Sequence, residues 1–160
     1  MTIAVGDRIP DVEIRVMGSD KPEPVRTGDV LGTGKVVLFA VPGAFTPTCS
    51  DHHLPGYVIR AGELRAKGVD TVACLSVNDP YVMDAWGDDQ EVGDAVVMLA
   101  DGNGTFTRMM GLESDKSGAG LGTRSQRYAA VIDDGIITTL LVEPTGDLTV
   151  SSAESVLAIL

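Results

Sequence analysis

Residues 36–50 read VVLFAVPGAFTPTCS, an apolar run followed by a loop of small residues, proline and threonine that ends at a cysteine. The apolar segment Val36–Val41 is typical of a strand covered on both faces in a parallel sheet. Thr46 is a good helix N-cap, and Pro47 suits the first helical position because it has no N–H group to leave unpaired. The stretch therefore predicts a strand, a turn and a helix that carries Cys49 near its start.

Similar elements lie on both sides of this stretch. We expect strands at 12–16, 69–77, 95–100, 128–132 and 136–142, and helices at 47–67, 81–90 and from about 151 onward. Asp133-Asp134-Gly135 predicts a tight turn between the last two strands. No repeat or linker divides the chain. We predict one α/β domain over residues 1–160, a thioredoxin-like fold with a central mixed β-sheet flanked by helices and an N-terminal β extension.

The composition limits the partners of this domain. The chain has 12 Lys or Arg against 23 Asp or Glu, a net charge of −11, so nucleic acid and anionic membranes are poor electrostatic partners. Residues 81–160 carry only 4 basic side chains against 13 acidic ones, which makes an arginine there unusual. No apolar run reaches the roughly 20 residues that span a bilayer, and no secretory signal opens the chain. We expect a water-soluble, cytoplasmic protein, or one of an organelle matrix if a presequence has been removed.

Cys49 is expected at the third helical position. Free backbone N–H groups and the positive end of the helix dipole favour the thiolate there, and the thiolate is the nucleophilic form of cysteine. Pro55 lies inside the predicted helix, where it removes a hydrogen bond and predicts a kink. The first turns, with Cys49, can then unwind without melting the rest of the helix.

Two other interpretations of Cys49 stay open at this point. Many free cysteines are small, buried apolar residues. Zinc is a second option because His52 and His53 follow closely, but a fourth ligand is missing and Cys74 belongs to a predicted strand. His52 is expected to be exposed. We predict no metal and no cofactor.

The segment 42–50, PGAFTPTCS, resembles the peroxidatic-cysteine signature of peroxiredoxins, most of all that of the type II, peroxiredoxin-five-like subfamily. Other matching pieces follow the family order along nearly the whole chain: VGD (5–7), IP (9–10), HLPGY (53–57), LSVND (75–79), GTRSQRY (122–128) and VEP (142–144).

The resemblance implies a thiol peroxidase that reduces hydrogen peroxide and organic hydroperoxides. In that family the cysteine matching Cys49 attacks the peroxide, and the threonine matching Thr46 hydrogen-bonds the thiolate and the substrate. The proline matching Pro42 shields the site, and the arginine matching Arg124 holds both thiolate and substrate. The chemistry agrees, because attack on a peroxide needs donors where negative charge develops on the departing oxygen.

Two more residues are predicted to support the site. His53 matches a family histidine just after the catalytic cysteine, in a packing or hydrogen-bonding role. Arg127 is either another supporting residue or a surface charge paired with the acidic second half of the chain.

Oxidation gives a sulfenic acid, which a second thiol must reduce. Animal members carry a resolving cysteine in the segment corresponding to residues 148–152, where this chain has Val150. Cys74 remains, either as a resolving thiol or as a buried apolar residue, and a disulfide would need Cα atoms within about 7 Å. We expect a one-cysteine-like cycle in which glutathione with glutaredoxin, or thioredoxin, is the reductant.

The resemblance also implies a homodimer. A different function stays open, a redox-sensing relay that passes the oxidation of Cys49 to a partner without sustained turnover. A chaperone-like oligomer is a third hypothesis, and its activity would survive replacement of Cys49 by serine.

Overall fold

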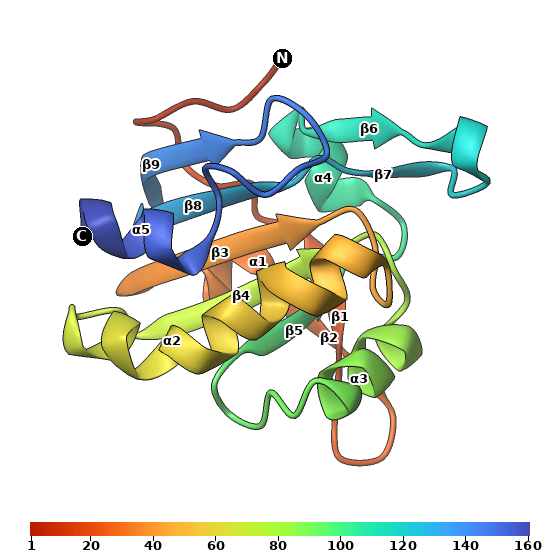
Figure 1. Cartoon of the computed structure of the whole chain (residues 1–160), viewed down its shortest axis with the longest axis horizontal. Helices are drawn as coiled ribbons and strands as arrows, with labels where there is room; N and C mark the ends of the chain where they lie inside the picture. The colour runs from red at the N-terminus through yellow and green to blue at the C-terminus, as the bar shows by residue number, and fades with distance from the viewer.

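The computed structural model describes residues 1–160 and contains a seven-stranded mixed sheet with helices on both faces (Figure 1). The strand order is β2-β1-β5-β4-β3-β8-β9. Neighbours β3, β4 and β5 are parallel, and all other pairs are antiparallel. The strands of this sheet are β1 (Glu13–Met17), β2 (Pro22–Arg26), β3 (Lys35–Val41), β4 (Thr71–Ser76), β5 (Val97–Ala100), β8 (Tyr128–Asp133) and β9 (Ile136–Val142). The predicted α/β fold, with its mixed sheet, flanking helices and N-terminal β extension, is confirmed, and the extension is the antiparallel hairpin of β1 and β2.

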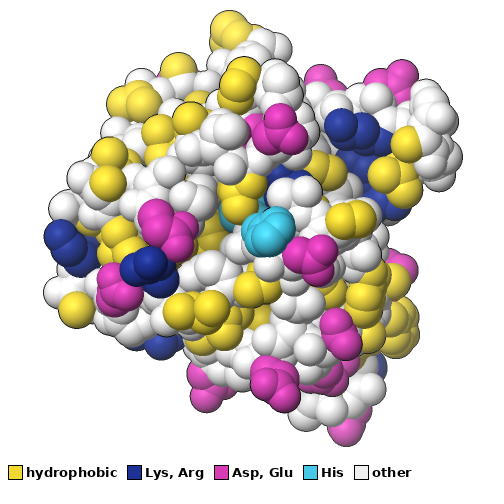
Figure 2. Space-filling model, viewed as in Figure 1, with side chains coloured by type: hydrophobic (Ala, Val, Ile, Leu, Met, Phe, Trp, Pro, Cys, Tyr) yellow, Lys and Arg dark blue, Asp and Glu magenta, His cyan; other side chains and the backbone are white.

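The central strand β3 is buried on both faces because helices cover each side of the sheet. Val37, Phe39 and Val41 pack under α2, α3 and α5, whereas the alternate side chains pack with α1 and α4. The helices are α1 (Thr27–Val30), α2 (Leu54–Ala66), α3 (Pro80–Asp89), α4 (Thr105–Met110) and α5 (Ala153–Ile159). None of them is long and apolar enough to cross a membrane. Acidic side chains predominate around α3 on the face shown in Figure 2, in line with the charge of the chain.

The helix that carries Cys49 begins with a distorted turn. Pro47 and Thr48 are helical, Cys49–His53 form a π-helical segment (η1), and α2 continues from Leu54. The N–H of Leu54 donates to the carbonyl of Cys49, the wider spacing of a π turn. The break in regular helix falls just before Pro55, where the sequence predicted a distortion.

The hairpin between β8 and β9 has the predicted turn. Asp134 and Gly135 have φ angles of 47° and 85°, the left-handed values that a two-residue type I′ turn requires. Three features went unpredicted. Two are the short helices α1 and α4, and the third is a small antiparallel sheet of β6 (Glu113–Asp115) and β7 (Thr123–Ser125), which is joined through the short 3₁₀ turn η2 (Ser117–Ala119).

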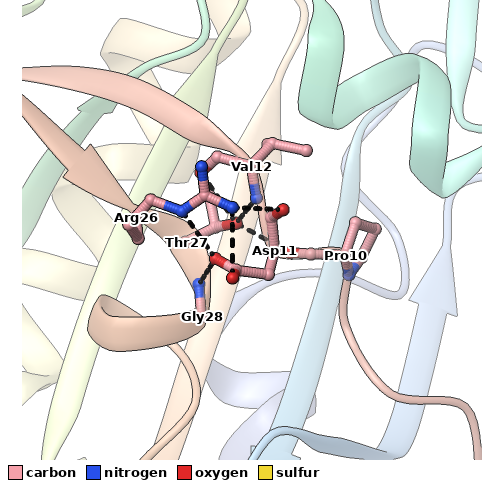
Figure 3. Close-up of polar contacts among 6 residues, drawn as sticks. All are labelled: Pro10, Asp11, Val12, Arg26, Thr27 and Gly28. Atoms are coloured by element: carbon pink, nitrogen blue, oxygen red, sulfur yellow. Dashed lines mark hydrogen bonds and ion pairs between the residues drawn. The ribbon is translucent and has the colours of Figure 1, made fainter.

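Thr27 joins the N-terminal segment to the start of α1 (Figure 3). Its buried hydroxyl donates to the carbonyl of Pro10 at 2.7 Å and accepts from the N–H of Val12 at 2.9 Å. Beside it, Asp11 accepts from Arg26 and from the N–H of Gly28, and the hydrogen bond from Arg26 lowers the pKa of the Asp11 carboxyl. These bonds hold the chain before β1 against the chain after β2.

Replacing Thr27 by valine is expected to destabilise the fold without touching the site around Cys49. The isosteric change leaves the half-buried N–H of Val12 without its side-chain acceptor, so the free energy of unfolding should fall by about 1–3 kcal/mol. Urea unfolding measures the change, and Thr33→Val in an exposed loop is the matched control. Equal stability of the two variants would show that the Thr27 hydroxyl contributes nothing.

Candidate active site

Cys49 lies at the third helical position, as predicted, and its side chain is completely buried. The carbonyl of Thr46 accepts from the N–H of Ser50 at 3.0 Å, which closes the first turn. The Ser50 hydroxyl in turn accepts from the indole N–H of Trp86 on α3 at 3.0 Å. The turn that carries the thiol is therefore held from the neighbouring helix as well as by its own backbone.

The loop between β3 and this helix is fixed by groups at the end of β4. The Asn78 side chain accepts from the N–H of Ala44 at 3.0 Å and from the hydroxyl of Ser76 at 2.6 Å. Phe45 has a φ of 63°, a left-handed value that is costly for a phenylalanine. Its strained backbone persists because the loop is bonded on both sides, and such strain is common at functional sites.

Arg127 is the arginine that contacts the thiol. Its Nη2 lies 3.3 Å from the Cys49 sulfur, its Nη1 lies 2.9 Å from His53 Nδ1, and its Nε donates to the Gly146 carbonyl at 3.3 Å. All three guanidinium nitrogens are thus engaged, and the residue is only 4% exposed. A planar, permanently charged fork held on three sides is well suited to stabilising negative charge on sulfur or oxygen.

Arg124, predicted to hold the thiolate and the substrate, does not contact the Cys49 sulfur in this structure. Its Nε donates to the Leu121 carbonyl at 2.8 Å and its Nη1 to the Pro42 carbonyl at 3.5 Å. The reason is topological: Arg124 belongs to β7 and pairs with Ser114 of the small sheet, whereas Arg127 directly precedes β8 of the large sheet. Arg124 therefore bonds to the loop at Pro42 and does not contact the thiol.

His53 links Arg127 to the far end of the chain. An arginine can only donate, so His53 Nδ1 accepts, and His53 Nε2–H donates to the Ser151 carbonyl at 2.9 Å. Burial and the charge of Arg127 lower the pKa of His53 to about 3. The ring is therefore neutral at physiological pH, with both nitrogens occupied, and it offers no free lone pair to a metal ion. The supporting role predicted for His53 now has a definite geometry.

Pro42 and Thr46 lie in the loop between β3 and the helix that carries Cys49. The Thr46 hydroxyl donates to the Gly43 carbonyl at 2.7 Å. A Cβ on Gly43 would lie 3.1 Å from both the Arg124 guanidinium and the Thr46 methyl group, so glycine keeps this corner compact. Pro42 and Arg127 also line a polar cavity of about 240 Å³.

Comparisons with known proteins support this reading of the site. The redoxin family profile matches residues 4–157. The chain is 49% identical over 158 residues to peroxiredoxin-2B of Arabidopsis thaliana, covering 97% of this chain and 96% of the relative. The chain is a peroxiredoxin of the redoxin family.

Two further relatives place this peroxiredoxin near the plant type II members. It is 48% identical over 160 residues to the chloroplastic peroxiredoxin-2E of Arabidopsis thaliana, covering 98% of this chain and 68% of the relative. The crystal structure of reduced Prx3 from Vibrio vulnificus in complex with hydrogen peroxide superposes with a TM-score of 0.94 at 48% identity, and the match covers 99% of each chain. The peroxiredoxin is a thiol-dependent peroxidase, with Cys49 in the position of the peroxidatic cysteine.

Cys74 of this peroxiredoxin lies in the middle of β4, paired with Phe39 on one side and Met98 on the other. It is fully buried in the same core cluster as Cys49. Burial and the nearby Cys49 raise the pKa of the Cys74 thiol well above its usual value. A neutral thiol inside a central strand is a poor attacking group, which favours the buried apolar role over the resolving role.

From the sequence, Arg127 is predicted to be either a supporting residue or a surface charge, and Glu143 is not predicted to take part. Both signals were present: Arg127 is one of only three arginines after residue 81, and Glu143 is a charge at the end of an apolar strand. These signals do not reveal what each side chain contacts. Arg127 bonds to Cys49, 78 positions away, and Glu143 bonds to Ser151, 8 positions away.

Proposed function

We propose that this peroxiredoxin reduces hydrogen peroxide and organic hydroperoxides by attack of the Cys49 thiolate, with Arg127 as the principal donor. The sulfur attacks the outer peroxide oxygen, the O–O bond breaks, and the alkoxide or hydroxide leaves and takes up a proton. Cys49 becomes a sulfenic acid, oxidised by two electrons, and the peroxide becomes an alcohol or water. The observation that carries this proposal is the 3.3 Å contact between Arg127 Nη2 and the sulfur.

The other groups at the entrance have narrower roles in this proposal. The Thr46 hydroxyl, now bonded to the Gly43 carbonyl, turns to donate to the bound peroxide. Pro42 shields the thiol, and Arg124 holds the Pro42 carbonyl and keeps the entrance in shape. A hydrogen peroxide complex is reported for the Vibrio relative, which supports the same substrate class here.

For the second half-reaction we propose a one-cysteine cycle. A thiol attacks the sulfenic sulfur and releases water, and a second thiol then breaks the mixed disulfide and restores Cys49. Val150 replaces the resolving cysteine of the animal members, and Cys74 is buried. The reductant is therefore an external thiol, glutathione with glutaredoxin or thioredoxin, in a reducing cytoplasm or organelle matrix.

A large reductant can reach Cys49 only if the helix start opens, because the thiol is completely buried. The π-helical turn and Pro55 make the boundary at which it can open, since the regular hydrogen-bond pattern is already interrupted there.

We also propose a homodimer, consistent with the exposed apolar side chains of Phe45 and Tyr81. A monomer in light scattering would exclude that assembly.

Replacing Cys74 by alanine is expected to leave peroxide turnover nearly unchanged with either reductant. The change removes a small buried group, so it should lower the unfolding free energy by about 1–2 kcal/mol. Steady-state peroxide consumption is measured with glutathione plus glutaredoxin and with thioredoxin plus its reductase. Loss of turnover with one donor only would make Cys74 a resolving thiol for that route and contradict the one-cysteine cycle.

A further inference from the structure

Glu143, directly after β9, accepts more hydrogen bonds through its side chain than any other residue of the molecule. It was not predicted as a site residue, and it has no part in the proposed reaction. Its side chain is buried, with the residue only 4% exposed. Its carboxylate accepts from the backbone N–H groups of Thr149, Val150 and Ser151 at 2.8–3.0 Å. It also accepts from the hydroxyls of Thr149 at 2.6 Å and Ser151 at 2.7 Å.

Five donors on one carboxylate require its ionised form. Burial alone would raise the pKa of Glu143, but the hydrogen bonds from Thr149, Ser151 and Val150 outweigh burial and lower the pKa to about 2. An ionised carboxylate can only accept, which matches a ring of donors. The group therefore stays charged throughout the physiological range and closes residues 144–151 into a loop, called here the strap.

The strap supplies two backbone carbonyl groups that orient Arg127 and His53 beside Cys49. Its Gly146 carbonyl accepts from Arg127 Nε at 3.3 Å. Its Ser151 carbonyl accepts from His53 Nε2–H at 2.9 Å and from the Tyr57 hydroxyl at 2.8 Å. His53 then presents Nδ1 to Arg127. Most of the strap is exposed, so its shape depends on the bonds at its two ends.

We propose that Glu143 is a positioning residue for the peroxidase reaction: through the strap it sets the tautomer of His53 and the direction of the Arg127 guanidinium. The backbone strengthens the connection, because the Glu143 N–H donates to the Arg127 carbonyl at 2.9 Å. This inference rests on the proposed role of Arg127 at the thiol. Glu143 touches neither the sulfur nor the peroxide and acts only through the strap.

Loss of the carboxylate should make the site sensitive to acid. The ionisable groups around His53 are Arg127, Glu143 and Tyr57, and Cys49 bonds to the same guanidinium as the ring. If the strap opens, water reaches the ring and relieves its burial, the largest cause of the lowered pKa. This relief outweighs the loss of the Glu143 charge, which by itself raises the His53 pKa, so that pKa rises from about 3 toward its usual 6.5. Below that pKa the ring carries a proton on Nδ1, cannot accept from Arg127 and repels it. At higher pH the ring is neutral in both proteins.

The test compares Glu143→Gln with Asp147→Asn, which removes an exposed carboxylate from the same strap. The chain has only two histidines, so ¹³C-histidine NMR resolves His53 beside the exposed His52. In the wild type and in Asp147→Asn, the His53 signal should not titrate between about pH 5 and 8. In Glu143→Gln it should titrate within that range.

Single-turnover oxidation of Cys49 by hydrogen peroxide gives the second readout, with the thiolate fraction followed by its ultraviolet absorbance in the same samples. The rate per thiolate should fall about 10–100-fold in Glu143→Gln on the acid side of this range, and clearly less on the alkaline side. Should that variant fail to fold, Thr149→Val removes only the 2.6 Å bond and should shift both readouts in the same direction by less.

The double variant Arg127→Gln with Glu143→Gln separates the two proposals. If Glu143 acts through Arg127, the double variant should be no slower than Arg127→Gln alone. One outcome would overturn this inference only: in Glu143→Gln the His53 signal does not titrate and the oxidation rate of Cys49 is unchanged, whereas Arg127→Gln loses much of that rate. No loss in Arg127→Gln would overturn the proposed role of Arg127 and the catalytic part of this inference with it.

Discussion

Replacement of Cys49 by serine is expected to abolish peroxide turnover, a loss of about 10³-fold or more, to the background of the reaction without protein. Serine nearly matches cysteine in shape and can still accept from Arg127, so the fold should persist. Its hydroxyl is not ionised near neutral pH and cannot displace an alkoxide from a peroxide. Peroxide consumption at steady state, with either reductant, measures the loss.

The Cys49→Ser variant also separates the functional classes considered for this chain. Circular dichroism and urea unfolding should match those of the wild type, which makes the variant a test of chemistry alone. Peroxide turnover that survived in the folded variant would show that another group is the nucleophile. A chaperone-like activity, by contrast, would be untouched by the change.

Replacement of Arg127 by glutamine is expected to slow the reaction of Cys49 with hydrogen peroxide by about 10²–10³-fold, the usual cost of losing one preorganised donor at a site of developing charge. Glutamine keeps a polar end but loses the charge and the three-way bonding to Cys49, His53 and Gly146. Stopped-flow oxidation of the reduced protein measures the rate directly.

Arg124→Gln is the matched control for this prediction. Arg124 bonds only to the carbonyls of Leu121 and Pro42, so its loss should loosen the entrance and cost less than about tenfold in rate. A larger effect at Arg124 than at Arg127 would reverse the assignment made from the geometry and restore the one made from the sequence.

The strongest local patterns predicted the fold well. The run Val36–Val41 became the central strand β3, and Asp134-Gly135 became the hairpin turn. Helix α4 was not predicted because its six residues are too few to show the hydrophobic period of a helix. It is held instead by Asp101, whose carboxylate accepts from the N–H groups of Phe106 and Thr107 and from the Thr107 hydroxyl. That stabilisation depends on how the end of β5 meets the next turn.

The site was predicted where its chemistry is local and missed where it depends on tertiary contacts. Cys49 at the third helical position follows from Thr46 and Pro47 alone. The choice between Arg124 and Arg127 does not, because they lie only three positions apart and the chain passes from one sheet to the other between them. Glu143 is hidden for a similar reason, since its donors come from a loop that the sequence marks only as polar.

The most direct test of the central claim is the number of hydrogen peroxide molecules that one protein molecule consumes in the presence of glutathione with glutaredoxin, or thioredoxin with its reductase. A peroxidase with Cys49 as its nucleophile predicts many turnovers with at least one donor, and a single sulfenic acid trapped on Cys49 when no donor is present. Consumption of a single equivalent with every donor would contradict the claim and leave a redox relay in its place.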